Sequence, residues 1–137
     1  HNLTIIDLPY KMRIAWDINT TVTRIQCHKL IAPNLLEVFR LLEVQYGYDR
    51  IKELGIVLYG GCVNVSLMRG SKTKWSRHAW GIAIDLDPAR NKLKETHKTA
   101  RFARPEYKLM VDIFYANGFI GLGPEQDRDW MHFEISS

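Results

Sequence analysis

The stretch SRHAWGIAIDLD, residues 76–87, holds side chains that can bind a metal ion. His78 and Asp85 stand seven residues apart in it, and a second histidine, His132, lies in DWMHFE near the end of the sequence. Two imidazoles and one carboxylate can form a catalytic zinc site that leaves a fourth position for water. The helical zinc motif H-E-x-x-H does not occur in the sequence. We therefore predict His78, Asp85 and His132 as the metal ligands.

A hydrolytic zinc site also needs a base and a positive charge. Asp129 stands three residues before His132 and is the predicted base, because a carboxylate can take a proton from water and pass it to the leaving amine. Arg69 is the best candidate to stabilise the tetrahedral intermediate. Asp87 and Glu134 share the strand faces of the ligands, and a supporting role for them stays open.

Two strands must position two of the ligands. In residues 81–87 and 131–136, apolar residues alternate with polar ones, which is typical of strands with one buried face. If these strands are neighbours in one sheet, Asp85 and His132 project from the same face. His78, just before the first strand, then reaches in as the third ligand.

The hydrophobic periodicity of the rest of the sequence predicts an α+β fold. A helix is expected in residues 33–47, capped by Asn34 and ended by Gly47, with an apolar stripe of Leu35, Val38, Phe39, Leu42 and Tyr46. A second is expected in 105–118, with Tyr107, Met110, Val111 and Phe114 as its stripe. Residues 55–61 favour a strand, whereas 19–33 fit a helix or a loop. The elements follow no repeating βαβ order, so we expect a small, mostly antiparallel sheet with flanking helices.

Length and composition fit one soluble domain over residues 1–137, with 46% hydrophobic and 25% charged residues. No apolar run approaches the ~20 residues of a membrane span, and no export signal opens the sequence. Cys27 and Cys62 are expected as buried free thiols rather than a disulfide. The net charge of +4 suits a polyanion, which includes nucleic acid, anionic lipid and bacterial cell wall.

Residues 88–105 are rich in lysine and arginine and poor in apolar residues. They fit a solvated, flexible loop or a basic rim over a substrate groove. Trp75, Trp80 and Trp130 stand close to the ligands in sequence and are expected to pack around the site.

The pattern S-x-H-x-x-G-x-A-x-D in SRHAWGIAID, followed by the acid-x-x-H of DWMHFE, resembles the zinc D-Ala-D-Ala carboxypeptidase family of peptidoglycan peptidases. The resemblance is greatest to the phage L-alanyl-D-glutamate endolysins. It implies zinc bound by His78, Asp85 and His132, with Asp129 as acid/base. It also implies that Arg69 stabilises the oxyanion and that Ser76 binds substrate. The implied fold is shared with the hedgehog amino-terminal domain.

The expected function is therefore zinc-dependent hydrolysis of peptidoglycan stem peptides, at the L-Ala–D-Glu bond. A D,D-carboxypeptidase that removes terminal D-Ala, and an idle zinc domain that binds wall or a protein partner, are the alternatives. The expected partner is the stem peptide, without nucleic acid or membrane insertion, and the chain is expected to be a monomer. The expected location is the cell wall, after synthesis in the host cytoplasm.

Overall fold

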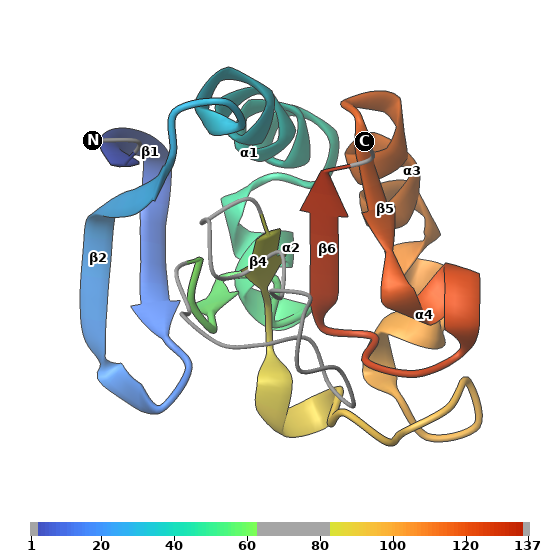
Figure 1. Cartoon of the computed structure of the whole chain (residues 1–137). Helices are drawn as coiled ribbons and strands as arrows, with labels where there is room; N and C mark the ends of the chain where they lie inside the picture. The colour runs from blue at the N-terminus through green and yellow to red at the C-terminus, as the bar shows by residue number, and fades with distance from the viewer. Residues whose placement is uncertain (1–2, 63–82, 136–137) are drawn as a thin grey trace, which may run out of the picture.

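The structure is a computed structural model that describes residues 3–62 and 83–135. It contains two three-stranded sheets, ordered β2-β1-β3 and β4-β6-β5, together with helices, as Figure 1 shows. All strand pairs are antiparallel except β1 with β3, so the predicted α+β class is confirmed. Arg69, Ser76 and His78 lie outside the described residues, as do Trp75 and Trp80.

The first sheet is built on a long hairpin. Strands β1 (Leu3–Ile14) and β2 (Asp17–His28) pair antiparallel, and β1 pairs with the short β3 (Leu58–Tyr59). The segment that fitted a helix or a loop is therefore mostly strand. Its threonines, valine and isoleucine favour extended backbone, but β2 lies at the sheet edge and is largely exposed, so no clear alternation marks it.

Helices α1 (Ala32–Tyr46) and α2 (Tyr48–Glu53) follow the hairpin. Four members of the predicted stripe are fully buried and Tyr46 is half-buried, while Gly47 ends α1 with a φ of 79°. The predicted cap is wrong. Ile31 caps α1, and Asn34 lies inside the helix, where its amide donates to the carbonyl of Asn117 at 2.9 Å.

The second sheet combines β4 (Ala83–Asp85), β5 (Phe119–Gly121) and β6 (His132–Ile135). The predicted second helix is present as the short η4 (Pro105–Tyr107) and α3 (Lys108–Ala116), and it stops at Asn117. Its Phe114 stacks on Phe133 of β6, with ring centroids 4.0 Å apart. These rings join α3 to the strand that carries His132.

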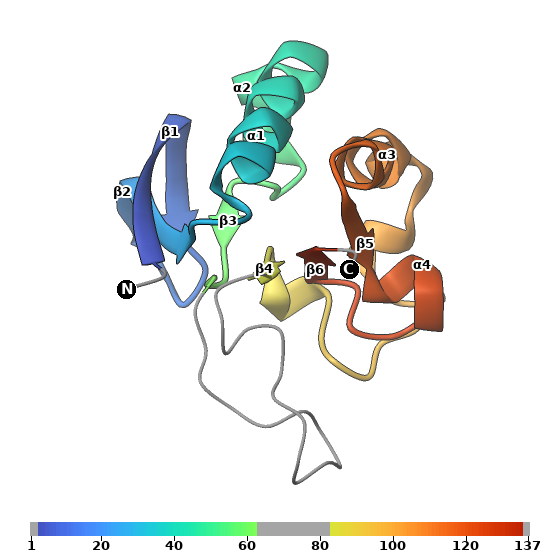
Figure 2. The ribbon, with the colours of Figure 1, turned by 45° about the horizontal axis from the view of Figure 1, so that its top comes forward.

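Backbone hydrogen bonds connect the two sheets. The Gly60 amide donates to the Asp85 carbonyl at 2.8 Å, and the Asp85 amide donates to the Gly61 carbonyl at 3.0 Å. Helices α1 and α3 lie on one side of the strands in Figure 2. Both cysteines, Cys27 and Cys62, are buried and free, as expected.

Candidate metal and catalytic site

Strands β4 and β6 bring two predicted ligands together. In their antiparallel register Asp85 lies directly opposite His132, and Ile84 lies opposite Phe133. Ile84 and Phe133 are buried in the core. Since side chains alternate along a strand, Asp85 and His132 share the other face. The prediction that they project from one face is confirmed.

The His132 imidazole lies between two carboxylates. Its Nδ1 is 3.2 Å from Oδ1 of Asp85, and its Nε2 is 2.8 Å from Oε1 of Glu134. The His132 residue is only 5% exposed. Glu134 therefore contacts Nε2 of His132, the ring nitrogen that does not contact Asp85. This contact agrees with the supporting role that the sequence left open for Glu134.

The protonation of His132 follows from these contacts. Burial lowers its pKa, but the hydrogen bonds to Asp85 and Glu134 and the charges of Asp85 and Asp129 raise it to about 9. In the metal-free protein at neutral pH, the imidazolium can donate one hydrogen bond to each carboxylate.

The separation of Asp85 and His132 agrees with two ligands of one zinc ion as well as with a direct hydrogen bond. Two ligand atoms at ~2.0–2.2 Å from tetrahedral zinc lie roughly 3.3 Å from each other, and the observed separation is 3.2 Å. Glu134 can accept the Nε2 proton, which leaves Nδ1 as the metal-binding nitrogen. Within residues 3–62 and 83–135, no three His, Cys, Asp or Glu side chains are grouped to hold a metal. The third predicted ligand, His78, lies outside that range, so the complete set stays a prediction.

Asp129 lies in the loop between α4 (Leu122–Gln126) and β6, and two backbone hydrogen bonds hold it. Its amide donates to the carbonyl of Leu93 at 2.9 Å, and its carbonyl accepts from the amide of His132 at 3.0 Å. The second bond couples the predicted base directly to a predicted ligand. Its role in catalysis stays a prediction.

Asp87 does not support the site by any contact that the structure gives. Its buried carboxylate pairs with Arg90 at 2.7 Å, and the pair packs against Gly55. Trp130 is half-buried over Gly123, where an added Cβ would lie 2.1 Å from the indole. Trp130 therefore packs on α4, and the expectation that it packs around the metal site stays a prediction.

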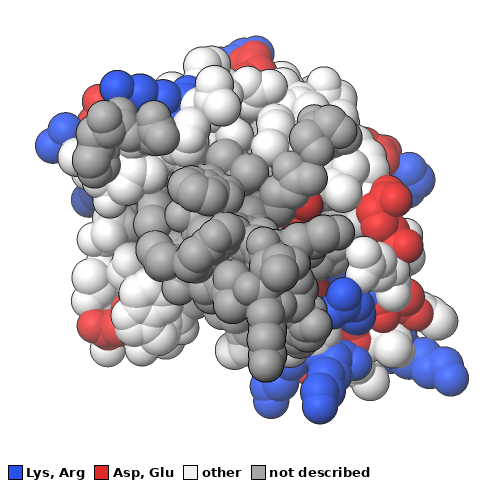
Figure 3. Space-filling view, viewed as in Figure 1, with Lys and Arg blue, Asp and Glu red and all other residues white. Residues whose placement is uncertain are grey.

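The basic segment after β4 is anchored at several points. Short helices η2 (Pro88–Arg90) and η3 (Arg101–Ala103) lie near its two ends, and between them Asn91 is fully buried and accepts a hydrogen bond from the Phe102 amide at 2.7 Å. Lysines 92, 94 and 98 are exposed. Figure 3 shows lysine and arginine side chains along the lower edge of the face that it presents. Both a solvated loop and a basic rim agree with this arrangement.

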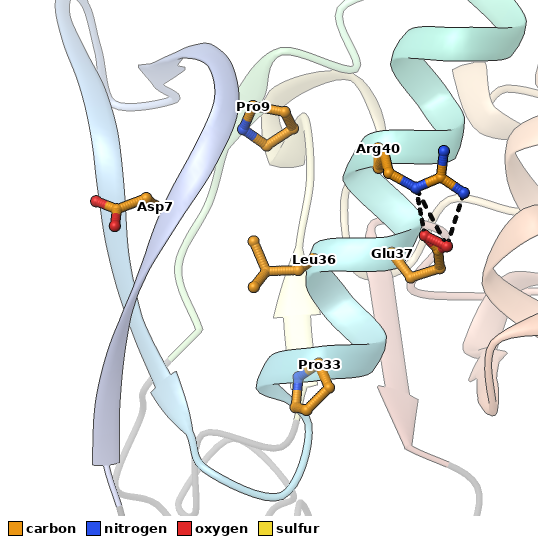
Figure 4. Close-up of a pocket in the computed structure, with 6 residues that line it drawn as sticks. All are labelled: Asp7, Pro9, Pro33, Leu36, Glu37 and Arg40. Carbon is orange, nitrogen blue, oxygen red and sulfur yellow. Dashed lines mark hydrogen bonds and ion pairs between the residues drawn. The ribbon is translucent and has the colours of Figure 1, made fainter.

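A separate groove of about 450 Å³ lies between β1 and α1 (Figure 4). Its lining contains three apolar residues, one carboxylate from β1, and the pair formed by Glu37 and Arg40. It has no histidine or cysteine and shares no residue with the site at Asp85 and His132. It therefore offers neither metal ligands nor a catalytic base next to one.

Comparison with known proteins points to the class of the site. A family model described as D-alanyl-D-alanine carboxypeptidase matches residues 69–135. Over this segment, which is just under half of the chain, the sequence is similar to that peptidase family. The matched segment contains Arg69, Ser76, His78, Asp85, Asp129 and His132. No curated protein and no solved structure matched the chain. None of the described helices is long and apolar enough to cross a membrane.

Two contacts near the site had no clear signal in the sequence. Glu134 could be placed on the face of His132 from strand alternation, but its bond to Nε2 could not. His97 pairs with Asp127 at 2.7 Å across thirty residues of sequence. His97 lacks the strand alternation that marks His132, and Asp127 belongs to no recognisable motif.

Proposed function

We propose that this protein is a zinc metallopeptidase that hydrolyses peptidoglycan stem peptides at the L-Ala–D-Glu bond, as a phage-type endolysin does. The observation that carries the proposal is the placement of Asp85 directly opposite His132, with Asp129 close by, inside the segment that matches the peptidase family. The choice of bond rests on the resemblance of the sequence motifs to the phage branch.

Each residue has one chemical task in this proposal. Asp85 and His132, together with His78, hold the metal, and Glu134 orients the His132 ring. When bound, zinc supplies a Lewis acid and lowers the pKa of water to about 7. Asp129 removes a proton from the attacking water and returns it to the leaving amine. Arg69 stabilises the oxyanion and Ser76 binds the substrate.

The experiment is mass spectrometry of purified peptidoglycan after incubation with the protein, with and without a zinc chelator. Fragments with a new D-Glu amino terminus that disappear with chelator are expected. Cleavage that persists after complete zinc removal would contradict the metal-dependent mechanism.

The same measurement separates the alternatives. Loss of terminal D-Ala without internal cleavage would identify a D,D-carboxypeptidase, whose pocket must recognise a free carboxylate. Binding of zinc without any cleavage would identify an idle domain that binds wall or a protein partner. The proposed site of action is the cell wall, after synthesis in the host cytoplasm, and the proposed active form is a monomer.

A further inference from the structure

We propose that His97 and Asp127 are positioning residues that hold the 127–131 loop so that Asp129 faces the metal site. This inference rests on the proposed function, because it assigns the two residues a task in placing the catalytic base. They join two segments that are thirty residues apart in sequence, the basic segment after β4 and the loop before β6.

The Asp127 carboxylate receives hydrogen bonds from both segments. Its Oδ1 accepts from the backbone amide of His97 at 2.6 Å and from the indole of Trp130 at 3.1 Å. Its Oδ2 lies 2.7 Å from Nδ1 of His97. The hydrogen bond to the His97 side chain is the main cause that holds the pKa of Asp127 below its usual value. The Asp127 side chain thus connects the 127–131 loop to the basic segment that contains His97.

The backbone of the loop needs such support. Asp127 and Asp129 both have left-handed backbone, with φ of 52° and 53°. This conformation is unfavourable for an L-residue, although aspartate tolerates it better than most. The Asp127 amide also donates to the Gly123 carbonyl at 2.7 Å, and the Asp129 amide to Leu93 at 2.9 Å. The surrounding hydrogen bonds therefore stabilise an unusual backbone conformation at Asp129, the proposed base.

Trp130 provides a third anchor. Its indole lies so close to Gly123 that a methyl group there would collide with it, and its Nε1 donates to Asp127. Asp127, two residues before Asp129, is therefore bonded to His97, and Trp130, directly after Asp129, packs on Gly123 of α4. These contacts fix the backbone from which the Asp129 side chain projects.

The expected consequence is kinetic. A general base must lie within hydrogen-bond reach of the proton that it removes, and a misplacement of about 1 Å can cost ~10²-fold in rate. The His97 and Asp127 side chains are 63% and 43% exposed, so their pairing adds little to the free energy of unfolding. Loss of the pair should lower kcat without unfolding the protein.

The test compares the full-length wild type with His97→Ala, Asp127→Ala and the double variant, using chelator-sensitive cleavage of a synthetic stem peptide. We expect each single variant to lose about 10- to 100-fold in kcat, with KM and zinc content nearly unchanged. His97→Ala should keep its melting temperature, whereas Asp127→Ala should lower it, because alanine tolerates left-handed backbone less well than aspartate. The double variant should lose no more than the worse single variant, because both act through one interaction. Asp127→Asn should recover most of kcat, since asparagine keeps the oxygen acceptor and tolerates left-handed backbone. Lys98→Ala, on the same segment, is the matched control.

Unchanged kcat in both single variants, or losses that multiply in the double variant, would overturn the proposal. Hydrogen exchange at the Asp129 amide gives a readout that needs no activity, and it should accelerate when the pair is broken. Normal exchange would also overturn the proposal. An inactive wild type with accelerated exchange in the variants would instead defeat the proposed function and leave the structural role of the pair standing.

Discussion

At the level of single residues, His132 is the centre of the site because both of its ring nitrogens face carboxylates. A nitrogen that must bind a metal has to lose its proton first. In the proposed site, Asp85 and Glu134 therefore have different tasks: Asp85 binds the metal together with His132, and Glu134 accepts the remaining proton of the ring and sets its orientation.

Replacing Glu134 by glutamine should weaken zinc binding about 10- to 100-fold, because partners of this kind set the orientation and basicity of a ligating histidine. Competition with a fluorescent zinc chelator measures the change. Glu125→Gln, an exposed acid on α4, is the control and should bind zinc as the wild type does. Equal affinity in Glu134→Gln would remove Glu134 from the site.

Replacing Asp129 by asparagine should lower kcat about 10²- to 10⁴-fold while zinc stays bound, because the amide cannot take a proton from water. Stem-peptide cleavage and metal analysis on the same sample measure the two effects. Unchanged turnover with full zinc occupancy would show that another group is the base.

The pKa of His132 predicts how pH affects the metal-free protein. Because the folded-state pKa is raised from 6.5 to about 9, the stabilisation is fully present below about pH 6.5 and is lost as pH rises through 9. Urea unfolding of chelator-treated protein at pH 6 to 10 measures this trend. In His132→Asn the free energy of unfolding should no longer fall over this pH range. An equal fall in that variant would mean that other groups cause it.

At the level of elements, the site depends on the register of β4 and β6. The alternation in residues 81–87 and 131–136 predicted which face of each strand carries Asp85 and His132, because one buried face permits only one orientation of each strand. That the two strands are neighbours was a condition of the prediction, and the structure supplies this pairing. The bond between His132 and Glu134 and the pairing of His97 with Asp127 depend on tertiary placement, which local patterns do not contain. The same is true of β2, whose exposed edge position hides its alternation.

A substitution at Phe133 tests whether core packing holds β6 in its register with β4. It is buried and stacks on Phe114, so Phe133→Ala should destabilise the protein by about 3–5 kcal/mol through lost contacts and a cavity. Urea unfolding measures this, with Val44→Ala, on the exposed face of α1, as a control expected within ~0.5 kcal/mol of wild type. A small effect at Phe133 would mean that the stacked rings do not hold β6 in place.

At the level of the whole molecule, the site lies in the sheet formed by β4, β6 and β5, and α3 supports that sheet from the core side. The hairpin of β1 and β2 is connected to it through β3, by the hydrogen bonds between Gly60, Gly61 and Asp85. The backbone of Asp85 is therefore bonded within the second sheet and to the segment that follows β3. If Asp85 binds the metal as proposed, metal binding should stabilise the folded chain.

The most direct test of the central claim is a zinc titration of the metal-free protein, followed by stem-peptide cleavage at each step. We predict that activity returns in proportion to zinc and saturates at one ion per chain, and that His132→Ala neither binds the ion nor regains activity. Full activity without metal, or full zinc occupancy and cleavage in His132→Ala, would contradict the account.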